Sequence, residues 1–491
     1  MRKISIWEFG RAFVFLGLMT TLTVVFAATS KPTPKKIRLS LHDAIQLAVR
    51  DNPNVRQTQL SYLSEKFNLQ VQQWAFHPHF SFQASATTTR NSVPLLPSVM
   101  TQGWSAQPGA SLLTPVGTQV TVTSINQDNG DFNPGLSMQV VQPLMRGFGK
   151  AIVQTALNNA RDSEMISRLA IESALRNTVS AVVSAYLDIV AAEKAIQIDQ
   201  DAVKRAEAAV HQTRLFIKAG HKAGNELVTV KANLASAKTQ LENNKNNLLQ
   251  MQYALLAAIG LDPNLTVSFA SLDMDKLQQK YHMPTLEETK AFVLEQDIQY
   301  QTDQITLNGS SRRALTSAED NTRWQLNLSA SASTGNGIGG GDNAGWNSLT
   351  NGINQSQGVS LVLQVPIDDQ ASKQAVQQAK IAIQQAELAL KQEKWNKQTS
   401  AINGWNSVIS ARNALRFARE SEKWQEKTYR VSYQKYLHGL IDSLELQGAQ
   451  TQLIMSQQIL LGARVNYIKS LVNVDFLVGH TLKTWDVQVR L

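Results

Sequence analysis

Two long stretches of the chain repeat one pattern of apolar and polar positions. Residues 156–260 align without a gap on residues 375–479 at a shift of 219, with 16 identical positions among 105. Each stretch has the composition of a long polar helix, breaks at a glycine (Gly220 or Gly439), and resumes six residues later with a Glu-Leu pair. Beyond each break, apolar residues recur at the alternating three- and four-residue spacing of a coiled-coil seam. The pattern therefore predicts two helical hairpins related by an internal duplication.

The seam of the first hairpin is interrupted once, at Asn244. Its other positions are Leu227, Val230, Leu234, Ala237, Leu241, Leu248, Met251 and Leu255. The second hairpin keeps the same frame with smaller residues. Its positions are Leu446, Ala449, Leu453, Ser456, Leu460, Ala463, Tyr467, Ser470 and Val474. We expect the hairpins to cover residues 149–258 and 372–478, with closely packed helices.

Helical patterns also precede each hairpin, in residues 41–76 and 285–320. Ser40 is a suitable N-cap for the first of them, and Pro53 interrupts it because the residue before a proline disfavours helical angles. The arm before Gly220 has about 70 residues, roughly 105 Å of helix, whereas the arm after it is about half as long. We therefore expect residues 41–76 to stack end-on with the short arm and complete an antiparallel layer. Residues 285–320 are expected to do the same in the second half.

Between these helices the hydrophobic period changes from that of a helix to that of a strand. Alternating apolar and polar residues predict strands at 79–90 and 134–144 in the first half, and at 324–333 and 358–367 in the second. We expect the two strands of each half to pair with each other. The loop inside the first pair is 23 residues longer than its counterpart, which allows an inserted hairpin at 105–127.

The strand lengths suit a tilted crossing of a lipid bilayer, which takes about nine to eleven residues. Beyond the N-terminal segment no run reaches 18 consecutive apolar residues, so we expect any membrane-embedded part to be β-structure. Four strands cannot close a barrel, and open sheet edges are not tolerated in hydrocarbon. Three chains with four strands each would give twelve, an even number that can close. If these strands lie in a membrane, several chains must therefore each contribute their strands to one barrel, which would make this an α+β membrane protein.

The first residues have the pattern of a secretory signal peptide. Basic residues precede an apolar run that ends near Ala27, so we expect residues 1–27 to be removed and residues 28–38 to form a polar lead. An uncleaved membrane anchor is the alternative, although the run is short for a spanning helix. Residues 261–284 are expected to join the two halves as an equatorial linker. Residues 480–491 are expected to form a C-terminal tail.

Composition narrows the functional classes. The formal net charge is +9, and residues 1–27 carry three basic residues and one acidic residue, so about +7 remains after cleavage. This charge is spread thinly along the helices and is not the footprint of a nucleic-acid-binding protein. The chain has no cysteine, which excludes a disulfide scaffold, a thiolate zinc site and a lipoprotein attachment residue.

In order and spacing, several motifs together resemble the TolC-like outer-membrane efflux protein family over nearly the whole mature chain. The motifs are LSLHDAIQLA at 39–48 followed by Asn52-Pro53, QPLMRGFG at 142–149, and the stretch from Gly439 through Glu445-Leu446 to Gln450. The resemblance implies a homotrimer in the outer membrane of a Gram-negative bacterium. A twelve-stranded β-barrel, four strands per protomer, would be continuous with a long α-helical barrel in the periplasm. It implies a passive exit duct and neither catalysis nor a cofactor.

The same resemblance implies the partners. A periplasmic adaptor (membrane fusion) protein and an inner-membrane transporter of the RND, ABC or MFS class would deliver substrates, as in tripartite efflux or type I secretion. The helix turns would form the periplasmic mouth and contact the adaptor. The turn residues are Gly220, His221, Lys222, Gly439 and Leu440.

Acidic residues just inside the mouth line its constriction in that family, and Glu226 and Glu445 match those positions. Under threefold symmetry each would form a ring of three carboxylates that favours cations and can bind a blocking metal ion. The alternative is that both are first-turn acids stabilised by a helix N-terminus. The family's gate also has an aspartate and an arginine where this chain has Gly448 and Ile441. We therefore expect substitutes for its salt-bridge lock, for which the candidates are Asp442, Tyr433, Lys435 and His438.

Three further motifs have simpler interpretations. His77 and His79 flank a proline at a helix-to-strand junction with no third ligand indicated, so we expect interfacial residues and no metal site. Gly335, Gly337 and Gly340 fit a nucleotide-binding spacing, but no helix follows, which favours a hairpin loop. Aromatic residues near the strand ends suit a belt at the membrane surfaces, or outer loops. They are Trp104, Trp324 and Trp346.

A second function remains open from sequence. A secreted structural or pore-forming α-helical protein with β-hairpin insertion elements would share the signal peptide, the helices and the strands. Cell fractionation separates the two functions, because the first predicts residence in the outer membrane and the second predicts release. No pair of residues with the pattern of a nucleophile and its base is found, so an enzyme is not expected.

Overall fold

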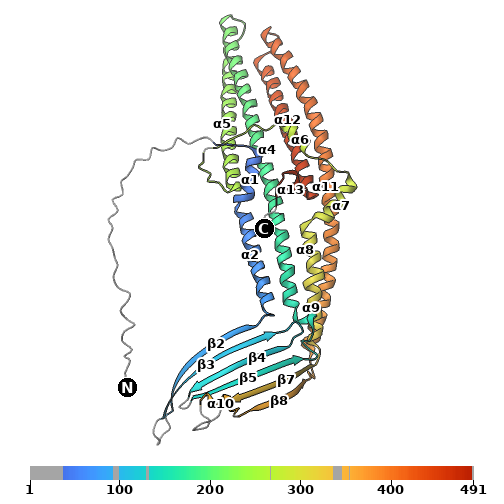
Figure 1. Ribbon diagram of the computed structural model, residues 1–491. Helices are drawn as coiled ribbons and strands as arrows, with labels where there is room; N and C mark the ends of the chain where they lie inside the picture. The colour runs from blue at the N-terminus through green and yellow to red at the C-terminus, as the bar shows by residue number, and fades with distance from the viewer. Residues whose placement is uncertain are drawn as a thin grey trace, which may run out of the picture.

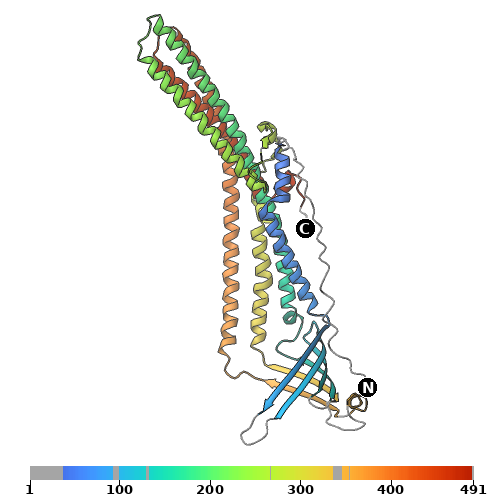
Figure 2. The same cartoon turned by 90° about the vertical axis from the view of Figure 1, so that its left-hand side faces the viewer.

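The structure is a computed structural model that describes residues 37–91, 99–128, 132–265, 267–335, 345–352 and 354–488. The expected signal peptide and nearly all of the polar lead lie outside the described residues, as do Gly337 and Gly340. The molecule is long and narrow, with a curved β-sheet at one end and two helical hairpin turns at the other (Figure 1). The helical part bends partway along its length (Figure 2).

The first half of the chain alternates between the two ends of the molecule. Its elements are β1 (Ile37–Leu39), α1 (Leu41–Asp51), α2 (Pro53–Trp74), β2 (His79–Asn91), β3 (Val99–Leu113), β4 (Gln119–Asp128), β5 (Phe132–Pro143), α3 (Lys150–Val153), α4 (Thr155–Lys218) and α5 (Glu226–Ile259). Helix α4 is the long arm of the first hairpin and α5 is the short arm. Ser40 caps α1, as the sequence predicts. At the other end of α1, the Asn52 side chain caps α2.

The second half repeats this order after a short connection. Its elements are β6 (Val267–Phe269), α6 (Met274–Lys280), α7 (Leu286–Gln296), α8 (Ile298–Thr306), the π-helical turn η1 (Leu307–Ser311), α9 (Arg312–Asn321), β7 (Gln325–Gly335), α10 (Asn347–Thr350), β8 (Ser356–Gln364), α11 (Gln370–Leu437), α12 (Ser443–Leu477) and α13 (Thr481–Thr484). The cap at Thr285 is a capping box with Glu288, as Ser40 forms with Asp43. The duplication therefore extends to the helix caps.

The six long strands form one antiparallel sheet in the order β2-β3-β4-β5-β7-β8. The sheet of one chain thus has six strands rather than four, because the inserted hairpin expected at 105–127 is itself two strands of the sheet. The expected pairing of the first strand with the strand at 134–144 is wrong for the same reason, since β3 and β4 lie between β2 and β5. Strand β5 instead pairs with β7 and joins the two halves. In the second half β7 pairs with β8, as predicted, with Gln325 opposite Gln364.

The short arm α5 ends against the junction of α1 and α2, which is the end-on stack expected from the helix lengths. Asn52 Nδ2 donates to Ala258 O at 2.6 Å, while its Oδ1 accepts from the backbone of Asn54 and Val55. Gly260 has φ +88°, and a Cβ there would lie 2.4 Å from Asp51 O. Only glycine fits this close approach in a left-handed conformation.

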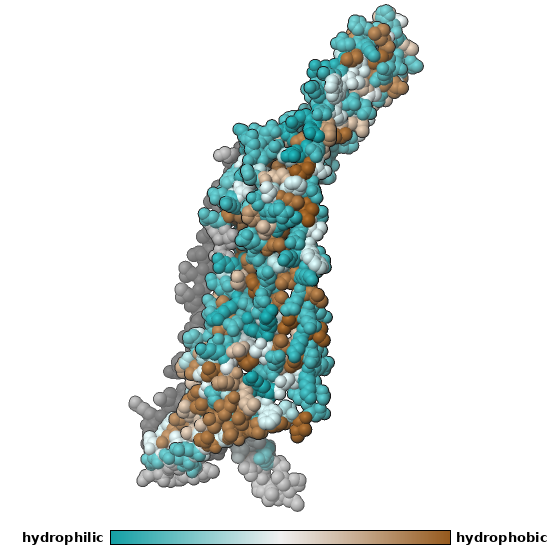
Figure 3. All heavy atoms as spheres, turned by 90° about the vertical axis from the view of Figure 1, so that its right-hand side faces the viewer, coloured by the Kyte–Doolittle hydropathy of each residue, from teal (hydrophilic) through white to brown (hydrophobic). Residues whose placement is uncertain are grey.

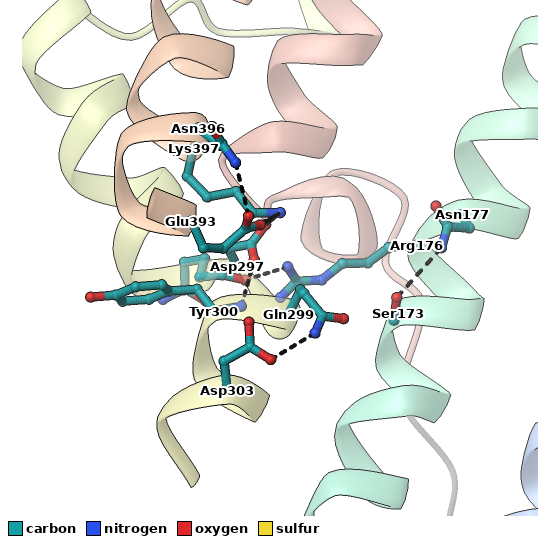
Figure 4. A network of polar contacts seen from close by, with 11 residues as sticks. Ser173, Arg176, Asn177, Asp297, Gln299, Tyr300, Asp303, Glu393, Asn396 and Lys397 are labelled. Atoms are coloured by element: carbon teal, nitrogen blue, oxygen red, sulfur yellow. Dashed lines mark hydrogen bonds and ion pairs between the residues drawn. The ribbon is translucent and has the colours of Figure 1, made fainter. Parts of the chain in front are cut away.

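The equivalent joint in the second half is tied to α4 of the first (Figure 4). Arg176 Nη1 donates to Gln296 O, the end of α7, at 2.9 Å. Asp297 caps α8, and its Oδ2 forms an ion pair with Lys397 Nζ at 2.9 Å. Gly479 ends α12 with φ +78°, where a Cβ would meet the guanidinium of Arg176 at 2.7 Å. The two halves therefore meet through backbone carbonyls and charged side chains.

A compact core surrounds the middle of the helices. Strands β1 and β6 pair in parallel, and Tyr186 of α4 donates its hydroxyl towards Leu39 O (3.1 Å) and Ala270 O (2.7 Å). Burial raises the pKa of Tyr186 to about 12. Trp485 is also buried and donates from Nε1 to Tyr281 Oη at 3.2 Å. Leu482 and Trp485, which follow Gly479, are thus part of this core, although the sequence indicated only a tail.

The predicted seam of α5 faces its partner helix. All nine seam positions, Asn244 included, are buried or half-buried, whereas most other positions between Lys231 and Gln250 are exposed. At the interruption, Asn244 Nδ2 donates to a carboxylate oxygen of Asp199 on α4. Asp199 is 2% exposed, and burial raises its pKa while the bond from Asn244 lowers it. A single buried polar pair of this kind fixes the register of two helices.

Candidate functional site

The sheet has one apolar face and one polar face. Successive residues of a strand point to opposite faces, and the register places the even-numbered residues of β2, β3, β4, β5 and β7 on the same face as the odd-numbered residues of β8. The face formed by these residues is apolar over most of its area, and we call it the apolar face. Its apolar members are Phe80, Phe82, Ala84, Ala86, Trp104, Ala106, Pro108, Ala110, Leu112, Val120, Val122, Leu136, Met138, Val140, Leu326, Leu328, Ala330, Ala332, Val359, Leu361 and Leu363.

The opposite face, which we call the polar face, is rich in hydroxyl and amide side chains. They include Ser81, Gln83, Ser85, Thr87, Ser105, Gln107, Thr121, Thr123, Ser137, Gln139, Asn327, Ser329, Ser331 and Ser360. Among the described residues of this face none is Asp, Glu, Lys or Arg. A hydroxyl pair, Ser85 with Ser105 at 2.9 Å, bridges β2 and β3 on it. One face therefore suits lipid and the other suits water.

Among the elements that the structure describes, none covers most of the apolar face. Phe80 is 83% exposed and Val359 is 77% exposed. Hydrophobic residues gather over the sheet, beside a mainly hydrophilic helical body (Figure 3). Exposed apolar area of this extent marks contact with a membrane or another protein. Among the described helices, none combines the length and apolar character needed to cross a membrane.

Tryptophans flank the apolar face at both ends. Trp324 precedes β7 at the helical end and is half-exposed. At the far end the ring of Phe132 stacks on Trp104, with centroids 5.7 Å apart, and meets the edge of Trp346 at 5.2 Å. Trp104 is thus in a strand, whereas Trp346 belongs to the loop beside α10. These positions fit an aromatic belt at each lipid–water boundary.

The two hairpin turns have the same backbone geometry. Gly220 and Gly439 end α4 and α11 with φ +72° and +73°. In both turns the next residue donates back across the helix end: His221 N to Phe216 O and Leu440 N to Lys435 O, each at 2.9 Å. This is the Schellman motif, which favours glycine at the left-handed position.

Lys222 of the first turn is a clamp between the two turns. Its Nζ lies 2.9 Å from Glu226 Oε2 and donates to Ile441 O of the second turn at 3.3 Å. The same ammonium lies 4.3 Å from the centroid of the Tyr436 ring, as a cation–π contact. The Lys222 side chain is only 7% exposed. It was expected among surface residues that contact an adaptor, whereas the structure turns it inward.

The other predicted turn residues divide into two groups. Asp442 caps α12 by accepting from Glu445 N at 2.8 Å, and Tyr433 stacks on Tyr429 with ring centroids 6.1 Å apart. The remaining ones are exposed around the turns. They are His221, Lys435, His438, Leu440 and Glu445. Glu226 is paired with Lys222, so the two matched acids are not equivalent.

The sequence analysis did not identify Tyr436, beside the second turn, or its partner Thr213. Tyr436 is fully buried, and its hydroxyl lies 2.7 Å from Thr213 Oγ1 of α4. Its ring meets that of Phe216 at 5.8 Å. The available signal was the spacing of Tyr429, Tyr433 and Tyr436, which places three tyrosines on one helix face.

A cleft of about 300 Å³ lies behind this contact, between the two hairpins. Small and amide side chains line it, among them Ala206, Asn233, Ala237 and Gln450. Gln450 Nε2 crosses between the hairpins to donate to Ala202 O at 3.2 Å. The cleft therefore lies between the two hairpins, and no charged residue lines it.

Within the described part of the chain, no group of three or more His, Asp or Glu side chains is placed to hold a metal ion. The two histidines of the helix-to-strand junction contact Trp74 instead. Trp74 Nε1 lies 3.1 Å from His79 Nδ1, and its ring centroid is 5.5 Å from that of His77. They belong to the boundary between the helices and the sheet.

An open, two-faced antiparallel sheet that continues into duplicated helical hairpins defines a class of membrane channel protein. The family model described as outer membrane efflux protein matches residues 44–261 and 312–480. The chain belongs to the outer membrane efflux protein family. Members of this family are the outer-membrane channels of tripartite efflux systems. They form trimers and work with adaptors and inner-membrane transporters.

Solved structures show the same fold. CusC has 14% identity and a TM-score of 0.69, covering 92% of this chain and 95% of its own. VceC of Vibrio cholerae has 12% identity and a TM-score of 0.69, with coverage of 89% and 96%. The open state of the MtrE channel of Neisseria gonorrhoeae has 17% identity and a TM-score of 0.68, with coverage of 94% and 95%. No curated protein sequence matches the chain.

Proposed function

We propose that three copies of this chain form a passive exit duct in the outer membrane of a Gram-negative bacterium. The observation that carries the proposal is the sheet with one apolar face, one polar face and two unpaired edges. In hydrocarbon every backbone polar group needs a partner, so strands β2 and β8 at the two edges each need a strand from another copy. The helices then extend the duct into the periplasm.

The partners follow from the two ends of the molecule. At the turns, apolar side chains are exposed: Leu440 is 73% exposed, and Val228 and Leu444 are similarly accessible. We infer that a periplasmic adaptor binds here and that an inner-membrane transporter of the RND, ABC or MFS class supplies the substrate. Outer-membrane lipid contacts the apolar face of the sheet.

We further propose that the turns control the periplasmic mouth. Lys222, Glu226, Tyr436 and Thr213 hold the two turns of one chain together. A mouth built from three such pairs of turns opens when each pair moves as a unit or when the clamp is released. Glu445 is exposed in the first turn of α12 and is the better candidate for a ring of three carboxylates, since Glu226 is neutralised by Lys222.

Cell fractionation and planar-bilayer recording test the proposal together. The native chain is expected in the outer-membrane fraction, and the purified protein is expected to give stepwise conductance. Release of the chain into the medium would favour the secreted structural or pore-forming alternative. A purified monomer without conductance would contradict the duct.

A further inference from the structure

Resting on the duct proposed above, we infer that its wall has eighteen strands, six from each of three copies, and is wider than the twelve-stranded wall that the family resemblance implies. The six-stranded sheet of one chain is the observation that favours eighteen strands over twelve. The question is whether the inserted hairpin, β3 and β4, belongs to the wall or folds away from it.

The inserted hairpin has the same two faces as the rest of the sheet. On β3, Ala106 and Ala110 lie on the apolar face beside Ala84 and Phe80 of β2. On β4, Val120 and Val122 lie opposite Val140 and Met138 of β5. The polar residues Ser124 and Asn126 on this face bond to each other (3.3 Å), and Asn126 also donates to Ala106 O (3.2 Å). A hairpin outside the membrane has no need of an apolar face in register with its neighbours.

The turn of the inserted hairpin is fixed to the boundary between the sheet and the helices. Val116 O accepts from Gly149 N at 3.1 Å. Gly117 has φ +102°, and a Cβ there would lie 2.8 Å from Gly147 O. The turn therefore packs against the segment that leads from β5 into α3, where the wall continues into the helices.

The width of the sheet matches the helices above it. Near the sheet each chain presents four helices side by side, α2, α4, α8 with α9, and α11 (Figures 1 and 2). At about 9.5 Å per helix they span roughly 38 Å. Strands about 4.8 Å apart and tilted by about 40° take about 6.3 Å each along the wall. Six strands then span about 38 Å, whereas four span only about 25 Å.

The strand directions also allow closure. Neighbours are antiparallel throughout the sheet, so β8 at one edge runs opposite to β2 at the other. A second copy can therefore pair its β2 with this β8 and continue the antiparallel order. Three copies give a wall of radius about 18 Å, against about 12 Å for twelve strands, with the spacing and tilt above.

The lining of such a wall is uncharged, because the polar face has only hydroxyl, amide and a few apolar side chains besides His79 among its described residues. The sheet therefore passes bulky hydrophilic solutes without selecting for charge. Charge selection is left to the turns at the other end.

Cysteine labelling tests the inference, since the native chain has no cysteine. Three matched pairs each place one residue on the polar face and one on the apolar face. The variants are Q107C and A106C on β3, T121C and V122C on β4, and S329C and A330C on β7. A charged, membrane-impermeant thiol reagent is applied to the protein in liposomes. We expect the polar-face member of every pair to react at least about tenfold faster.

The β7 pair is the control, because β7 belongs to the wall in either count. On β3 and β4, equal labelling rates of the polar-face and apolar-face cysteines would overturn the eighteen-stranded wall. If the polar-face cysteine of β7 still reacted faster, the duct itself would be unaffected. Equal rates within the β7 pair would contradict the duct itself. Faster labelling of the polar-face cysteine on all three strands would support six strands per copy.

Discussion

At the scale of single residues, two acids that look equivalent in the sequence have different surroundings in the structure. Glu226 and Glu445 occupy matching positions after the two turns. Glu226 is paired with the buried ammonium of Lys222, whereas Glu445 is exposed. Charge selectivity should therefore depend on Glu445, and the cohesion of the turns should depend on Lys222.

Replacing Glu445 by Gln is expected to lower cation selectivity and to weaken block by multivalent cations, because a ring of three carboxylates is removed. Single-channel recording with and without a trivalent cation measures both effects. Asp442→Asn is unsuitable as a control because Asp442 caps α12, so Glu420→Gln, an exposed acid far along α11, is used. Unchanged block in Glu445→Gln would remove the assignment.

Replacing Lys222 by Met is expected to loosen both turns at once. The change removes the ion pair to Glu226 and the hydrogen bond to Ile441 O, interactions worth about 1.5–3 kcal/mol when a charged group takes part. Hydrogen–deuterium exchange should rise in peptides of both turns, although only the first is mutated. Lys218→Met, an exposed lysine at the end of α4, should change neither. Faster exchange confined to the first turn would show that Lys222 does not join the two.

At the scale of helices, the register and the joints depend on a few polar or glycine positions. Helices α4 and α5 share an otherwise apolar seam with one buried polar pair, Asp199 with Asn244. The halves of the chain meet at Arg176 and Gly479, where no side chain larger than hydrogen fits at position 479. We make separate predictions for Asp199 and for Gly479.

Asp199→Asn is expected to preserve the hydrogen bond to Asn244 and to remove a pH-dependent loss of stability. Burial raises the folded-state pKa of Asp199 above its ordinary 3.8, so the folded state binds the proton more tightly than the unfolded state. Stability therefore falls as the pH rises from about 3.8 through the folded-state pKa. The variant should melt at or above the native temperature at pH 7, with the difference shrinking below pH 4. A lower melting temperature at pH 7 would contradict this reading of the pair.

Gly479→Ala is expected to destabilise the joint by about 1–3 kcal/mol, because it combines a positive φ with contacts of 2.7 Å to Arg176 and 2.8 Å to Gln296. Gly462→Ala is the matched control. Gly462 lies inside α12 with open space around its Cα, so alanine there should stabilise by about 0.5–1 kcal/mol. Thermal melting of the two variants should shift in opposite directions.

At this scale the sequence predicts most of the fold. The helical hairpins, the Asn52-Pro53 break and the seam follow from local periodicity and caps, which need only neighbouring residues. The position of β3 and β4 does not, because the same alternation fits a separate hairpin or two further strands of the sheet. The inward turn of Lys222 is equally hidden, since its partner Ile441 is 219 residues away.

At the scale of the whole molecule, one chain provides an arc of wall and a matching arc of helices. Its sheet has two unpaired edges, an apolar face for lipid and an uncharged polar face for water. No described segment of the chain pairs with these edges, which supports the proposal that the functional unit is an assembly. The long hairpins then place the turns far from the membrane, where an adaptor can reach them.

Native mass spectrometry of the detergent-extracted protein tests this claim most directly, because it counts the chains in the intact particle. We expect a single species with three times the mass of the mature chain. A particle that contains one chain, or any number other than three, would contradict it.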